Sequence, residues 1–290
     1  MSSPASPARA RLRPRVRLPA ALRKPAAYVG AGLVALAVFT ALFAPWLAPH
    51  SPTESFFDAI QQPPSWQYPF GTDALGRCVL SRVIYGARIS LSVAVTAVLI
   101  GLSIGTLLGL IAGYVGGLID TVLMRATDVM LAFPEILLTI AIVAILGPAL
   151  QNTVLAVGFA AVPVYARTVR SAVLQVRKLE YIQAATALGR NDSGILWRHI
   201  LPNVLSPIIV VATVNVGTAI LITAGLSYVG LGAQPPTPEW GAMLSESRAY
   251  LQNGWWMATF PGLAITVLVI AFNLIGDTAR DVLDPRQRQR

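Results

Sequence analysis

The residues best suited to act on another molecule lie between Tyr181 and Pro202, in a polar, basic stretch flanked by two long apolar ones. Ala184 and Ala185 favour a helix, and neither proline nor glycine interrupts the chain before Gly189. Gly189 is suited to end that helix, and Pro202 is expected to close the unit. The pattern predicts a helix-turn-helix with a small-residue patch that another protein's surface can approach closely.

A second short helix is expected after the glycine, beginning at a cap formed by Asp192 or Ser193 and running to about Ile200. The alternative is that residues 178–202 are only a basic loop between two membrane spans.

Other kinds of chemistry lack the residues they need. The chain has no Gly-x-x-x-x-Gly-Lys-Ser/Thr loop to hold nucleotide phosphates, so we expect no ATP hydrolysis here. It has no His-Glu-x-x-His motif, and its two histidines, His50 and His199, are far apart. Cys78 is the only cysteine, which excludes an intramolecular disulfide or a cysteine-based metal cluster. We therefore expect no catalytic site and no bound metal.

Composition indicates what must position the patch. The 290 residues are 55% hydrophobic and only 12% charged, against roughly 25% charged in a typical soluble domain. The intervals from Arg88 to Asp120 and from Arg198 to Glu239 contain no charged residue. Each exceeds the ~20 apolar residues that a helix needs to cross a bilayer. The chain is therefore predicted to be an all-α, multi-pass membrane protein. Its net charge of +9 is not a sign of nucleic-acid binding in such a protein.

Basic residues set the predicted topology. Seven Lys/Arg and no acid fall in residues 1–24, and six Lys/Arg fall between 165 and 199. The positive-inside rule places both groups in the cytoplasm, with an even number of crossings between them. Six spans satisfy this rule, and they leave both termini cytoplasmic. Only four basic residues then lie outside: Arg77, Arg82, Arg88 and Arg248.

The first two spans are expected at about 28–48 and 89–112, and the last two at about 204–229 and 257–275. Between them, the third span is expected to start near residue 129 and the fourth to end near 167–170, with a turn at 147–152 separating the two. The corresponding domains are a basic, disordered cytoplasmic tail at 1–27 and a first helix with an external segment at 28–87. A transmembrane domain follows at 88–277, containing the loop 178–202, and then a cytoplasmic tail at 278–290.

Glycines suggest where the helices approach one another. The second span is rich in small residues at Gly101, Gly105, Gly109 and Gly113, which allow close packing inside a membrane. At the outer end of the fifth span, three more glycines permit a helix contact, a bend or a gate, with packing favoured over substrate contact: Gly225, Gly230 and Gly232.

Two further features have competing interpretations. Glu135 is expected near the inner end of the third span, as an interfacial carboxylate rather than a transport residue. Trp240, Trp255 and Trp256 belong to an external segment that either anchors at the membrane interface or docks a soluble protein.

The 181–202 stretch resembles the cytoplasmic coupling loop of ABC-importer permease subunits. The shared spacing is Ala184-Ala185, three residues, Gly189, eleven residues and Leu201-Pro202. Gln183 stands where that family usually has Glu, and His199 where it often has Ile. The variant is similar to the dipeptide/oligopeptide/nickel branch, of the oligopeptide permease C type, and Cys78 stands where that branch usually has Asp. Further family-like segments follow in order: Gly71–Arg77, Val79–Arg82, Tyr85–Leu91, Gly113–Gly117, Asp120, Leu123–Arg125, Asp128, Gly225–Gly232, Pro235–Pro236, Trp240–Gly241, Asn273–Asp277, Arg280–Asp281 and Leu283–Pro285.

The resemblance implies a type I importer permease in the cell membrane, with no cofactor of its own. Its partners would be a second permease, two ATPase subunits that bind ATP and Mg²⁺, and an extracytoplasmic substrate-binding protein. The residues assigned to coupling with the ATPase are Gln183, Ala184, Ala185, Gly189, His199, Leu201 and Pro202.

The alternative function is a self-contained secondary carrier or channel, with a membrane-embedded enzyme a distant third. A proton- or ion-coupled carrier needs ionisable groups within its spans. We expect no acidic residue in the middle of a span, which argues against the carrier. Dipeptides, longer peptides, glutathione and nickel complexes all remain open as substrates.

Overall fold

The computed structural model describes residues 25–283, and within that range the protein is built from helices joined by turns, with two isolated β-bridges and no strand longer than these. Five helices are long and apolar enough to span a membrane, and α4 with α5 pass the same test only as a pair bent by 91°, which is either a broken span or a re-entrant loop. The chain contains α1 (Pro25–Leu42), α2 (Ala44–Leu47), a 3-10 turn (Phe57–Ala59), α3 (Val79–Val115), α4 (Gly117–Leu131), α5 (Glu135–Leu146), α6 (Leu150–Val176), α7 (Glu180–Ala187), α8 (Asp192–Ile195), a π turn (Leu196–Ile200), α9 (Leu201–Tyr228), α10 (Trp240–Ser247), a second 3-10 turn (Arg248–Tyr250) and α11 (Trp255–Leu283).

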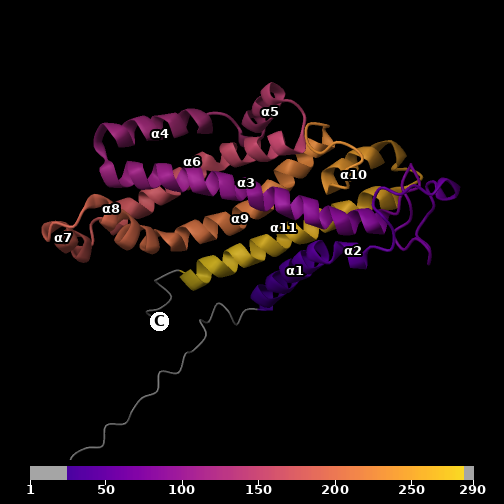
Figure 1. The fold of residues 1–290 in the computed structure, drawn as a ribbon, viewed down its shortest axis with the longest axis horizontal. Helices are drawn as coiled ribbons and strands as arrows, with labels where there is room; N and C mark the ends of the chain where they lie inside the picture. The colour runs from indigo at the N-terminus through magenta and orange to yellow at the C-terminus, as the bar shows by residue number, and fades with distance from the viewer. Residues whose placement is uncertain (1–24, 284–290) are drawn as a thin grey trace, which may run out of the picture.

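The long helices run roughly side by side, and the shorter ones collect at the two ends of the bundle (Figure 1). α7 and α8 project at one end, and α10 lies at the other with the segment between α2 and α3. We call these the coupling end and the outer end, after the locations predicted for them from the sequence. α3 packs along α6, and α11 packs against both α9 and α1. The chain therefore passes back and forth along the bundle. α4 and α5 lead back from the end of α3, so that α6 can run along α3 toward the coupling end again.

The glycines of α3 form its contact with α6, which is the kind of close packing that the sequence predicted for them. A Cβ on Gly105 would lie 2.5 Å from the Cβ of Tyr165 and 2.6 Å from the carbonyl oxygen of Val162. A Cβ on Gly109 would lie 2.7 Å from the Cβ of Val169. With hydrogen in place of side chains, the two backbones approach closely enough for dispersion contacts along their length.

The second span is longer than expected. α3 begins at Val79 rather than near residue 89, so the expected domain boundary at 87/88 falls inside this helix. Hydropathy misses the first ten residues because they include Arg82 and Arg88. Arg82 is only 1% exposed, and two carboxylates neutralise it. The span boundary predicted from charge left Arg82 outside the helix, but an arginine that is paired with carboxylates can be buried inside one.

The third span does not begin near Val129 as expected. Residues 117–131 form the helix α4, which ends in a break at 132–134 before α5 begins at Glu135. Proline at 134 cannot supply an N–H to a continuing helix, so α5 starts in a new direction. Two ion pairs tie α4 to α6, Asp120 with Arg170 at 2.5 Å and Asp128 with Arg167 at 2.5 Å.

The C-terminal boundary also moves, because α11 runs to Leu283 instead of ending near residue 275. The predicted disorder of the basic N-terminal tail lies largely outside the described residues, as does the end of the C-terminal tail.

Candidate functional site

The stretch between Tyr181 and Pro202 forms a helical unit at the coupling end (Figure 1). Ile182 is 2% exposed and joins a core cluster with Val173 and Ile195, which holds α7 against α6 and α8. Gln183 and Ala184 are exposed, and Ala185 is half-buried. Gly189 ends the helix with φ +75°, a conformation that favours glycine, and the space around it is open. The small-residue face predicted from the sequence is thus presented outward.

The second helix differs from its prediction. Its cap is Asn191, whose Oδ1 accepts a hydrogen bond from the Gly194 N–H at 3.2 Å, rather than Asp192 or Ser193. It does not stop at Pro202. A π turn at Leu196–Ile200 continues directly into α9, and Pro202 lies in the first turn of that helix. Proline is tolerated there because the wide turn removes the demand for its missing N–H.

His199 and Leu201 lie in this wide turn and just after it. Both side chains are half-buried, and Nε2 of His199 is enclosed without a hydrogen-bond partner. The carbonyl of His199 accepts a hydrogen bond from Nδ2 of Asn203 at 2.6 Å. His199 therefore contributes to the local structure of the turn. It also lies near α7, since the centroid of its ring is 6.4 Å from that of Tyr181.

Sequence reasoning missed what fastens this unit to the bundle. The hydroxyl of Tyr114, at the end of α3, donates to Oδ1 of Asp192 at 2.6 Å. Arg177 Nη1 donates to the carbonyl of Tyr114 at 2.9 Å. A groove of about 680 Å³ lies between this end of α3 and α7, with Gln183 among its lining residues. The tie joins residues 78 positions apart, so no local pattern could have revealed it.

The three glycines expected at the outer end of the fifth span have different surroundings. A side chain on Gly232 would collide with Ser227, at the end of α9. Gly225 and Gly230 face open space, and Gly230 has φ +85° in the turn after the helix. Of these three glycines, then, only Gly232 makes a close contact within the described residues.

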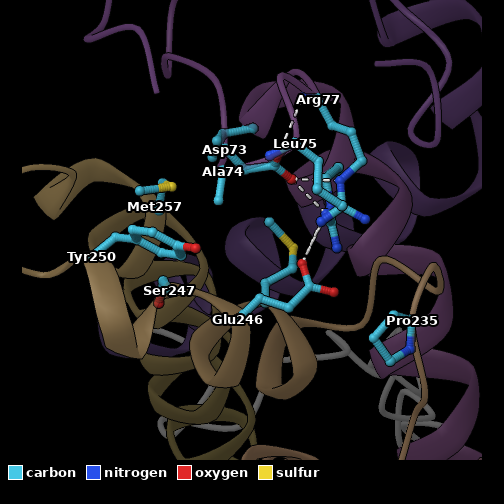
Figure 2. A pocket seen from close by; sticks show the side chains of 12 residues that line it. Asp73, Ala74, Leu75, Arg77, Pro235, Glu246, Ser247, Tyr250 and Met257 are labelled. Carbon is cyan, nitrogen blue, oxygen red and sulfur yellow. Dashed lines mark hydrogen bonds and ion pairs between the residues drawn. The ribbon is translucent and has the colours of Figure 1, made fainter. Parts of the chain in front are cut away.

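A buried ion network joins the outer segment to α10 (Figure 2). Oδ2 of Asp73 accepts from Arg77 Nε and from Arg82 Nη1, both at 2.6 Å. Oε2 of Glu246 accepts a hydrogen bond from Arg77 Nη2 at 2.5 Å and forms an ion pair with Arg82 Nη1 at 3.0 Å. These groups line a cavity of about 250 Å³ whose opposite side is formed by Tyr250 and other residues of the outer end. Two arginines that the topology placed outside are thus neutralised there.

Replacing Asp73 by asparagine should destabilise the outer end by about 3 kcal/mol, because it leaves two buried arginines with one carboxylate between them. Cys78 is completely buried close by and is the only cysteine, so its reaction with a thiol probe during heating reports the opening of this region. The purified chain should label at a lower temperature in Asp73→Asn than in wild type. Asp58→Asn, at an exposed position of the same segment, is the control and should label as wild type. Equal labelling temperatures for all three would show that the network does not hold the outer end.

The external tryptophans are mostly structural. Trp240 and Trp256 are 3% and 5% exposed, and their ring N–H groups donate to the carbonyls of Val83 and Thr72, both at 3.0 Å. Only Trp255 is largely exposed. The expectation that the three form an interfacial anchor or a docking surface is therefore wrong for two of them, because their rings fill the space between the outer segment and α3.

Glu239, just before Trp240, is the most deeply buried acid of this region. Its Oε2 accepts from the Ala242 N–H at 2.9 Å, which caps α10, and its Oε1 accepts from Ser90 Oγ at 3.3 Å. Burial raises the pKa of its carboxyl group above the usual range, although the hydrogen bonds oppose that shift.

Glu135 does not lie where the sequence analysis placed it. The α4–α5 break sets it against Ala97 and Val98, halfway along the 37 residues of α3. Val157 of α6 and Ala219 of α9 line the same small void. Glu135 is thus at mid-depth in the bundle, at the break between α4 and α5 and outside the five long helices.

Among residues 25–283, no cluster of three or more His, Cys, Asp or Glu side chains could hold a metal ion.

Comparison with known proteins places this geometry in a family. Residues 105–289 match the family described as "Binding-protein-dependent transport system inner membrane component". Residues 21–64 match the "N-terminal TM domain of oligopeptide transport permease C".

Individual relatives agree over most of the chain. The dipeptide transport system permease protein DppC of Escherichia coli K12 is 48% identical over 273 residues, 92% of this chain and 91% of its own length. The di/tripeptide permease DppC of Pseudomonas aeruginosa UCBPP-PA14 is 46% identical, covering 87% of this chain and 85% of its own. The glutathione transport system permease protein GsiD of E. coli O6:K15:H31 is 49% identical, covering 91% of this chain and 88% of its own.

A solved structure supports the fold. A chain of the MetNI methionine ABC transporter, in an inward-facing conformation, superposes with a TM-score of 0.58 at 21% identity. The match covers 70% of this chain and 97% of that chain. The fold, the matched segments and the relatives agree, and this multi-pass membrane protein belongs to the family of inner-membrane permease components of binding-protein-dependent ABC importers.

Proposed function

We propose that the chain is one of two permease subunits of an importer for dipeptides, oligopeptides or related small solutes. A second permease of similar fold would complete the path, two ATPase subunits would bind ATP and Mg²⁺, and an extracytoplasmic protein would deliver the solute. Curated relatives that are about half identical over nearly the whole chain are named for dipeptide and glutathione transport, which supports this substrate class.

The observation that carries the coupling role is the surface of α7 and the turn that follows it. Leu188 is 87% exposed and Trp197 is 56% exposed, although both lie at a charged end of the bundle, outside its apolar belt. Exposed apolar side chains beside a small-residue face are typical of a surface that another protein covers. We assign contact with an ATPase subunit to the face formed by Gln183, Ala184, Ala185 and Gly189, with His199, Leu201 and Pro202 supporting the turn that leads into α9.

Charge supports a cytoplasmic location for this end. The described basic residues of the loop between α6 and α9 all lie here, whereas two of the four arginines assigned to the outside, Arg77 and Arg82, are paired with carboxylates. Under the positive-inside rule, both termini are then cytoplasmic. The exposed outer glycines, Gly225 and Gly230, are available to the second permease.

The mechanism that follows is alternating access. ATP binding closes the ATPase pair, α7 moves with the surface on which it is docked, and α9, which is continuous with that unit, carries the motion across the membrane. This chain supplies the path and the mechanical connection, and its partners supply the energy.

The test is co-purification in mild detergent from the native cell, with identification and counting of the associated chains. We expect two ATPase copies, a second permease and ATP-dependent uptake of a labelled dipeptide after reconstitution with the binding protein. A homogeneous oligomer of this chain alone, isolated under conditions that preserve a control ABC importer and transporting in response to an ion gradient, would support a secondary carrier instead.

A further inference from the structure

A carboxylate without a cation lies in the middle of the helix bundle. Glu135 is the first residue of α5, and its side chain lines a void beside Ala97, the central residue of α3. With about 1.5 Å of rise per residue, this point is some 27 Å from either end of α3. Glu135 is therefore far from the aqueous ends, where a solvated carboxylate would cost little.

No basic side chain of the described chain compensates this charge. The ion pairs of residues 25–283 lie at the outer end, around Asp73, or toward the coupling end, where Asp120 and Asp128 pair with α6. No hydrogen bond to the Glu135 carboxylate forms within that range, although the amino end of α5 favours a negative charge there. An ionisable group at this depth is costly, and such groups usually serve a ligand or a proton.

Two further oxygen atoms face the same place. Tyr165 is completely buried, yet its hydroxyl has no well-formed hydrogen bond. The edge of its ring lies beside Gly101, one turn along α3 from Ala97 and Val98, which line the void. The Tyr165 hydroxyl interacts electrostatically with Asn215 and Glu135. Asn215 itself lines the void with Glu135. A carboxylate, an amide oxygen and a phenol oxygen thus converge from α5, α9 and α6, and all three accept hydrogen bonds.

The size of the void restricts what these oxygens can hold. Its volume is about 10 Å³, close to the minimum for one water molecule. A primary ammonium head is of similar size and carries three N–H donors, one for each acceptor, together with the positive charge that the carboxylate lacks. A water molecule would satisfy hydrogen bonds but would leave the charge unpaired.

A larger space lies beside one of these residues. Asn215 also lines an open cavity of about 780 Å³ toward the coupling end, between α6, α9 and α11. Asn203 and Ser206, about three and two and a half turns from Asn215 along α9, line that cavity too. A volume of 300–1,000 Å³ is typical of a small-molecule site, so the body of a short peptide fits beside the ammonium-sized void.

We propose that Glu135, Tyr165 and Asn215 form a recognition site for the primary ammonium group of the transported solute, with the rest of that solute lying along α9. The proposal rests on the proposed function, and it adds the chemical group that this chain would select. The proposal also accounts for the break between α4 and α5, because the break places the Glu135 carboxylate at the amino end of a helix in the middle of the bundle.

The test compares variants of the complete importer, reconstituted with its binding protein and ATPase subunits. Glu135→Gln keeps the size of the side chain and removes its charge. It should lower ATP-dependent uptake of a labelled dipeptide by about tenfold or more, the factor expected for losing one charged hydrogen bond. Co-purification of the subunits and ATPase activity without solute should be unchanged. Glu54→Gln, at an exposed position of the outer segment, is the matched control and should transport as wild type.

Binding to the importer without its binding protein tests the ammonium group directly. The complex in nanodiscs should retain a dipeptide with a free amino end at least about tenfold better than the same dipeptide with an acetylated one. Glu135→Gln should lose that preference. Tyr165→Phe keeps the ring against Gly105 and removes only a hydroxyl that makes no bond, so it should fold normally and weaken the preference.

The outcomes separate the two proposals. If the wild-type importer takes up no dipeptide, the proposed substrate class fails, and the ammonium site fails with it. If the wild type takes up dipeptide while Glu135→Gln imports at the same rate and keeps the same preference for a free amino end, the ammonium site alone is wrong.

Discussion

An importer carrying Gly189→Trp is expected to lose ATP-driven uptake by roughly 100-fold or more, while its permease chains still fold and pair. Gly189 lies at the exposed end of α7 with nothing near the position of a Cβ, so an indole there meets no atom of this chain. It would instead occupy the space proposed for the ATPase surface. Losing a close contact at the centre of an interface costs about 3 kcal/mol, which corresponds to that factor.

Backbone strain must be separated from bulk in this experiment. Gly189 has φ +75°, a conformation that L side chains rarely adopt. Gly189→Asn tests the strain alone, because asparagine tolerates this region, and it should keep most of the uptake. Gly147→Trp places the same bulk on a glycine with φ +94° in the turn between α5 and α6, away from the coupling end, and it should also transport.

Uptake rates and the amount of co-purifying ATPase are the measurements. Loss of both in Gly189→Trp alone would support docking at this face. Wild-type uptake by Gly189→Trp would contradict the assignment of the face, whatever the two controls do.

The second large effect concerns the fold itself, because Gly105→Leu should prevent α3 from packing on α6. Even the Cβ of the new side chain would lie 2.5 Å from the Cβ of Tyr165 and 2.6 Å from the carbonyl oxygen of Val162. Neither neighbour is the end of a flexible side chain, so the helices must separate and give up contacts at Gly101 and Gly109 as well. We expect destabilisation of more than about 4 kcal/mol, which lies at the extreme of single substitutions.

Gly32→Leu is the matched control, since it makes the same change on a membrane helix where nothing lies within 4 Å of the new Cβ. The amount of chain in the membrane and its unfolding temperature in detergent measure the effect. Gly105→Leu should give little folded protein and Gly32→Leu a normal amount. A Gly105→Leu chain as stable as the control would mean that α3 and α6 are not packed as closely as described.

Local sequence patterns predicted the features that depend on local chemistry. Glycines spaced by four residues marked the face of α3 that packs on α6, and Gly189 marked the end of α7, because only glycine suits both demands without cost. The predicted spans succeeded where apolar runs were long. They failed at the start of α3, where Arg82 is buried beside partners that hydropathy cannot see.

Features that depend on distant partners were not predictable. Arg77 and Glu246 are 169 residues apart, and Tyr114 and Asp192 are 78 apart. The depth of Glu135 was missed for another reason. The third span was expected to start near residue 129, which lies inside α4, and this placed the carboxylate too near the coupling end. The proline at 134 was the local signal, and it indicated a break without giving the depth.

The continuous helical path from Asp192 to Tyr228 has a mechanical consequence. Its 37 residues extend for about 55 Å. A rod of that length pivoting at its base by about 5° sweeps its far tip through roughly 5 Å, close to one helical pitch. A small rotation imposed on α8 therefore produces a much larger displacement at the Tyr228 end of the path. That displacement is large enough to admit or exclude a side chain, and it requires no bending of the helix.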